Sequence, residues 1–178
     1  MSGDQKRILS LTLMICLLIA CGGTGTVIPD TPTPGEVAKA VLEKVADIVC
    51  PDIPEVRVFA TDTGYGFWCA PAAGHSTTAT LQWFSNPGDA QAAFETRREG
   101  RPVREFHEFP LLVWDEDHPS FPGGRKEYRV WLWQAQHWLI GVQAFDDTHY
   151  IIAPDPGRVS EAIYQVGVEY DLFTVQED

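Results

Sequence analysis

Basic residues are scarce in this sequence. Lys and Arg together number 13, against 25 Asp and Glu, which gives a formal net charge of −12 over 178 residues. An acidic surface repels nucleic acid and also the anionic face of a membrane. We therefore expect no nucleic-acid partner, and we expect any membrane attachment to depend on something other than charge.

Long apolar runs are also few. The longest extends from Ile8 to Ala20 and follows a short segment that contains Lys6 and Arg7. It is shorter than the roughly 20 apolar residues that a transmembrane helix needs. A basic start followed by a short apolar stretch is typical of a secretory signal peptide, which we predict over residues 1–20.

The end of this run carries a recognisable motif. Leu18-Ile19-Ala20-Cys21 resembles the lipobox of bacterial lipoproteins, and the resemblance covers residues 1–21. It implies that Cys21 becomes the mature N-terminus, with diacylglycerol on its sulfur and a further acyl chain on its amine. Two or more acyl chains anchor a protein stably. The resemblance thus implies a lipid anchor in the cell membrane or outer membrane, with the protein facing outside the cytoplasm. An ordinary signal peptide with a chance cysteine and an uncleaved anchor are the alternatives.

Residues 22–35 offer little to bury. They are rich in glycine, threonine and proline. Such a composition does not offset the entropy lost on ordering, so we predict that 21–35 comprise the lipidated cysteine and a flexible tether. The alternative is an irregular arm packed on the domain. Residues 36–178 are long enough for a single globular domain.

Cysteine is limited to Cys16, Cys21, Cys50 and Cys69. Cys16 would leave with the signal peptide and Cys21 would carry lipid. The other two would then lie in an oxidising compartment, which predicts a disulfide between Cys50 and Cys69. Two buried free thiols or one reactive thiol are the alternatives.

Hydrophobic periodicity predicts an α+β fold. Helical spacing of apolar residues, or proline after a capping residue, predicts helices over 36–49, 86–100 and 155–170. Alternation and turn signals predict strands over 55–60, 67–69, 77–84, 103–109, 111–114, 127–134 and 137–145. The order is helix, three strands, helix, four strands, helix, and runs of adjacent strands imply an antiparallel sheet flanked by helices. This order is similar to that of the Mog1/PsbP-type sandwich.

Motifs for catalysis and cofactor binding are absent from the sequence. No serine lies in a G-x-S-x-G turn, and Gly74-His75-Ser76 is the nearest approach. His107, His118 and His149 lie near carboxylates but lack zinc or EF-hand spacing. No glycine-rich phosphate loop lies between a strand and a helix. We therefore predict no catalytic residue, no metal site and no cofactor.

Tryptophan is abundant, with six residues. Trp131 and Trp133 lie two positions apart on a predicted strand, so their side chains share one face of the sheet. They either fill the core under a helix or form part of an aromatic-lined pocket.

The leading hypothesis is a membrane-tethered, non-catalytic binding or accessory module for a protein or cell-envelope partner. One alternative is a small-ligand or glycan-binding module using Trp131 and Trp133. The other is a hydrolase or metal-dependent enzyme that uses the three histidines with neighbouring carboxylates.

Overall fold

The computed structural model describes residues 31–53, 55–72, 75–117, 127–146 and 155–173. The described fold belongs to the compact unit Pro32–Asp178. The predicted signal peptide, Cys21 and most of the predicted tether lie outside the described residues, as do Gly74, His118, Ser120 and His149.

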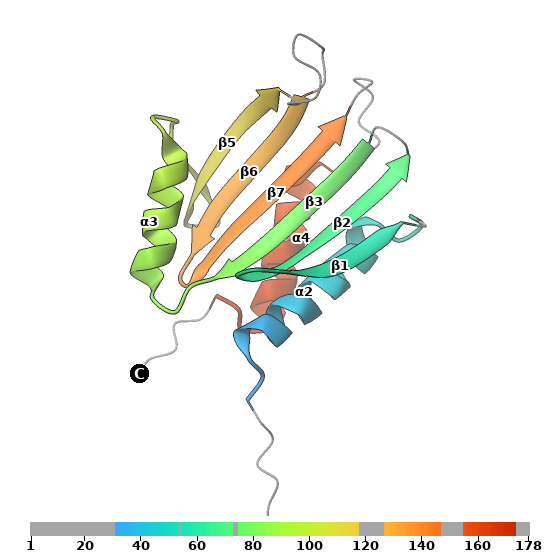
Figure 1. Ribbon diagram of the computed structural model, residues 1–178, viewed down its shortest axis with the longest axis horizontal. Helices are drawn as coiled ribbons and strands as arrows, with labels where there is room; N and C mark the ends of the chain where they lie inside the picture. Colours follow the sequence, from blue (N-terminus) through green and yellow to red (C-terminus); the bar gives the residue numbers. More distant parts are fainter. Residues whose placement is uncertain (1–30, 54, 73–74, 118–126, 147–154, 174–178) are drawn as a thin grey trace, which may run out of the picture. The chain divides into compact units, whose positions relative to one another are not determined.

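The described part forms three helices and one seven-stranded antiparallel sheet, shown in Figure 1. The sheet order is β1-β2-β3-β7-β6-β5-β4. The elements in chain order are α2 (Pro34–Val49), β1 (Val56–Thr61), β2 (Gly64–Ala72), β3 (His75–Trp83), α3 (Pro87–Arg98), β4 (Arg104–Phe106), β5 (Phe109–Asp117), β6 (Glu127–Ala135), β7 (Trp138–Asp146) and α4 (Pro156–Glu169). The predicted α+β class and the order of helices and strands are confirmed.

Each helix begins at a capping residue followed by proline. Thr33, Asn86 and Asp155 are the N-caps, and each side chain accepts a hydrogen bond from a backbone N–H of the first turn. Proline at the next position has its φ already set for a helix and lacks the N–H that would be unpaired there. At Thr33 the side chain of Glu36 reaches back to form a capping box. The first helix therefore begins at Pro34, two residues before the predicted start.

The break between β4 and β5 differs from the prediction, which placed it at Pro110. The turn lies instead at His107 and Glu108, whose φ values are +46° and +66°. Pro110 lies inside β5 opposite Glu105, and pairing with β6 begins only at Leu111. Because Pro110 pairs only with the three-residue edge strand β4, its missing N–H interrupts little of the ladder.

Helices α2 and α4 cover one face of the sheet, here called the back face. In Figure 1 they lie behind the strands. Their apolar sides pack on inward-facing residues of the strands, among them Phe67, Leu81, Trp133 and Ile140, and these form the main core. Burial of this continuous apolar surface is the principal stabilising term for the fold.

Helix α3 lies on the opposite, front face. Its Phe94 packs with Leu112, Leu132 and Leu139 from β5, β6 and β7 in a second, smaller cluster. Strand β6 is thus covered on both faces, as its apolar residues on alternating sides predicted. In the described part of the chain no helix covers the front of β1, β2 and β3, which Figure 1 shows facing the viewer.

The predicted disulfide is present. Cys50, at the end of α2, is bonded to Cys69 on β2, and both residues are buried. It ties the first helix to the back of the sheet.

None of the described helices is long and apolar enough to cross a membrane.

Candidate functional site

A recess on the front face, here called the sheet groove, lies between α3 and the strands that α3 leaves uncovered. Its volume is about 280 Å³. Four strands and one helix contribute its lining, which comprises Thr78, Thr80 and Gln82 of β3, Leu139, Gly141 and Gln143 of β7, Val130 and Leu132 of β6, Trp114 and Glu116 of β5, and Arg97 of α3. Most of these side chains are half-buried or buried, so the groove is recessed into the sheet.

Gly141 forms part of the floor of the groove. A Cβ atom at this position would lie 3.1 Å from the Thr80 Oγ1 and 3.7 Å from the Leu132 Cδ1. Even a methyl group there would press on the Thr80 hydroxyl, which would have to shift. The glycine in the middle of a central strand therefore allows a close approach to the sheet.

Trp114 forms a wall of the groove and is held on two sides. Its Nε1 donates a hydrogen bond to the Glu116 carboxylate. The Arg101 guanidinium lies over the indole, 4.7 Å from the ring centroid, and donates from Nη1 to the Arg97 carbonyl at 2.9 Å. These contacts fix the orientation of the indole before any ligand arrives.

Four polar side chains of the groove make no hydrogen bond with any described residue. They are those of Thr78, Thr80, Gln82 and Gln143, and they come from the adjacent strands β3 and β7. Buried polar groups are ordinarily paired within a protein. Thr78, Thr80 and Gln82 are half-buried and Gln143 is exposed, so these groups remain available to water or to a ligand.

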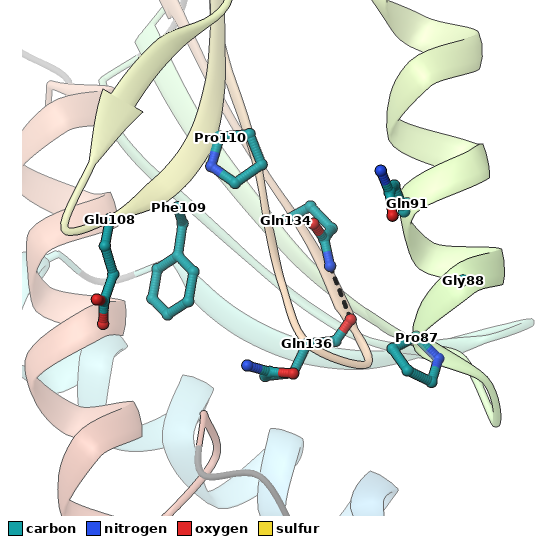
Figure 2. A pocket seen from close by; sticks show the side chains of 8 residues that line it. All are labelled: Pro87, Gly88, Gln91, Glu108, Phe109, Pro110, Gln134 and Gln136. Atoms are coloured by element: carbon teal, nitrogen blue, oxygen red, sulfur yellow. Dashed lines mark hydrogen bonds between the residues drawn. The ribbon is translucent and has the colours of Figure 1, made fainter.

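A second hollow, shown in Figure 2, has a volume of about 550 Å³. It lies between the start of α3 and the turns β4–β5 and β6–β7. Its lining comprises Pro87, Gly88, Gln91, Glu108, Phe109, Pro110, Gln134 and Gln136. The Gln134 Nε2 donates to the Gln136 carbonyl at 2.8 Å, marked by the dashed line. Because half of its lining residues are exposed, this hollow is a shallow surface feature.

His107 is the one candidate histidine within the described residues, and it pairs with a carboxylate. Its Nε2 lies 2.7 Å from the Glu161 Oε2, and its ring stacks on Tyr164 with centroids 3.8 Å apart. The hydrogen bond from Gln165, followed by that from His107, lowers the pKa of the Glu161 carboxyl. The pair joins the β4–β5 turn to α4.

Through this pair, His107 affects how the stability of the fold changes as the pH falls. A carboxylate with a lowered folded-state pKa stabilises the fold above its unfolded pKa, and that contribution is lost as the pH falls through the folded value. We expect His107→Ala to raise the Glu161 pKa toward its usual 4.5 without fully restoring it, because Gln165 remains. At pH 7 the substitution should lower the free energy of unfolding by less than about 1 kcal/mol, since both groups are exposed. NMR titration of the Glu161 side chain measures the shift, and an unchanged pKa would contradict the assignment.

The structure places Trp131 and Trp133 on the same face of β6, under α4. Trp133 has no exposed surface, and Trp131 is partly buried against Gly157 at the start of α4. Neither residue lines the sheet groove or the hollow of Figure 2. Their burial favours the interpretation as core side chains.

The other serine and histidine side chains of the described part are dispersed. His75 and Ser160 are buried on β3 and α4, Ser85 is exposed, and the His137 Nδ1 pairs with the Phe84 carbonyl at 2.9 Å. Within the described ranges, no three His, Cys, Asp or Glu side chains come together closely enough to hold a metal ion. Among the residues considered for catalysis or metal binding, the described part thus brings together only His107 with a carboxylate.

Sequence reasoning missed the sheet groove. Two local signals could have indicated it. Thr78, Thr80 and Gln82 alternate with buried Thr77, Ala79 and Leu81, which is the pattern of a strand with one uncovered face. A glycine within a strand, as at position 141, marks a site of close backbone approach.

Comparison with known proteins adds no relative. No protein-family model matches the chain, and none of the curated proteins is significantly similar to it.

Proposed function

We propose that this chain is a membrane-tethered, extracytoplasmic lipoprotein whose globular part is a non-catalytic binding module. The observation that carries the binding role is the sheet groove, where four polar side chains converge without partners among the described residues. A recess with a few convergent polar groups and an apolar wall is the usual form of a small-molecule site.

Two features support the proposed address. The lipobox-like sequence Leu18–Cys21 precedes the domain. The Cys50–Cys69 disulfide is the type of bond that forms and persists in an oxidising compartment outside the cytoplasm. A lipid anchor would also hold so acidic a chain at a membrane without any help from charge.

The address is tested by expressing the full chain in a bacterium and analysing the mature protein by mass spectrometry. We expect an N-terminus at Cys21 that carries diacylglycerol, and recovery of the protein with the membrane fraction. Cys21→Ser should abolish the lipid mass and the processing, because a serine offers no thiol for the thioether bond. Cys16→Ser, a matched change inside the predicted signal peptide, should have no effect. An unmodified N-terminus elsewhere, or a full-length form in the cytosol, would refute the proposal.

A further inference from the structure

The interior of the sheet groove is polar but uncharged. Its floor presents the hydroxyl groups of Thr78 and Thr80 and the amides of Gln82 and Gln143. A hydroxyl and a primary amide can each donate and accept hydrogen bonds. A complementary ligand therefore carries several groups that also do both.

The charges of the chain select against an anionic ligand. Arg97 and Glu116, both exposed, place one charge of each sign at the groove. Their charges offset one another, and the chain as a whole carries −12, which disfavours an anion. The arrangement favours a ligand without net charge.

The groove also has an apolar side. Val130, Leu132 and Leu139 are buried beneath it, and the fixed indole of Trp114 stands against it. An aromatic wall packs well against a flat or gently curved apolar surface and loses little entropy when it is already held. The ligand thus needs an apolar face as well as polar edges.

Size restricts the ligand further. About 280 Å³ lies just below the range of roughly 300–1,000 Å³ typical of small-molecule sites. The groove therefore accommodates a small compact molecule, or a short stretch of a longer chain that continues over the uncovered front of β2 and β1 (Figure 1).

We infer that the sheet groove binds a neutral carbohydrate, in the form of one or two sugar rings. A sugar ring combines an apolar face, which packs on the indole of Trp114, with hydroxyl groups that pair with the threonines and glutamines. The inference rests on the proposed function and names the ligand class of that binding site. An extended peptide fits less well, since peptides pair with free strand edges, whereas β3 and β7 are paired on both sides.

The experiment titrates the purified full chain with defined probes, using calorimetry and the NMR signal of the Trp114 indole N–H. The neutral probes are chitotriose, maltotriose and cellotriose. The comparison probes are trigalacturonate, which is acidic, and the tripeptide Gly-Gln-Gly. We expect at least one neutral trisaccharide to bind and to shift the Trp114 signal, and neither comparison probe to bind more tightly.

Two variants place the binding in the groove. Gln143→Ala removes an exposed amide from the floor and should weaken binding about five- to tenfold. Gly141→Ala puts a methyl group 3.1 Å from the Thr80 Oγ1 and should weaken binding at least as much. Gln91→Ala is the matched control, because this glutamine lines the hollow of Figure 2 and should leave the affinity unchanged. Circular dichroism verifies that each variant is folded.

Three results would overturn the inference. They are no binding of any neutral trisaccharide, tighter binding of trigalacturonate or of the tripeptide, and loss of affinity on Gln91→Ala with none on Gln143→Ala. The lipid analysis of Cys21 does not depend on these titrations, so failure of the carbohydrate inference and failure of the proposed address are separate outcomes.

Discussion

Trp133→Ala should lower the free energy of unfolding by about 3–5 kcal/mol, the usual range for loss of a large buried aromatic side chain. Trp133 has no exposed surface and is surrounded by the rings of Phe106, Phe109 and Phe173, at centroid distances of 5.1, 5.9 and 5.5 Å. Removing the indole leaves a cavity between β6 and α4 that the remaining rings fill only in part. Urea unfolding followed by circular dichroism measures the loss.

The control is Trp133→Phe. The indole Nε1 is buried and has no hydrogen-bond partner in the described structure. Phenylalanine keeps most of the aromatic volume and removes an N–H whose burial is itself unfavourable. Trp133→Phe should therefore lower the free energy of unfolding by less than half as much as Trp133→Ala does. Equal losses for the two variants would show that the volume of the side chain is not what stabilises this region.

Removing the disulfide should have the next largest effect. In the chain-entropy model, a bridge between residues 19 positions apart stabilises the fold by about 3 kcal/mol, because it restricts the unfolded chain. Cys50→Ala with Cys69→Ala should therefore lower the free energy of unfolding by about that amount. Both positions are buried, and alanine introduces no polar group into the core.

Reduction provides the matched comparison. Dithiothreitol should destabilise the native sequence by a similar amount and leave the double variant unaffected. If the double variant unfolded at the same urea concentration as the oxidised native protein, the bridge would contribute nothing to stability.

The sequence carried most of the information about local structure. Asn86-Pro87 and Asp155-Pro156 located two helix starts because capping and proline geometry act over a few residues. The alternation along β3 and β6 likewise reflects which face each residue takes. The sequence could not show that β3 pairs with β7, because that pairing depends on which distant strand lies beside it in the folded sheet.

The site was harder to predict for the same reason. The sheet groove combines Thr80, Trp114 and Gly141, which are far apart in the chain and carry no common motif. Trp131 and Trp133 were candidates for a binding pocket because they are aromatic and share one face of a strand. In the structure they pack under α4, in the core or against it. Local patterns report the face a residue takes, whereas a groove depends on which strands a helix leaves uncovered.

The capping box at Thr33 fixes the start of the first described helix, and Thr33 lies twelve residues after Cys21 in the chain. A chain of that length spans at most about 40 Å even when fully stretched. If the proposed lipid at Cys21 holds the chain at a membrane, the domain stays within about that distance of the bilayer surface. The domain would then meet only ligands that lie within that distance of the membrane. A longer tether would enlarge the volume that the domain explores and so lower the effective concentration of those ligands.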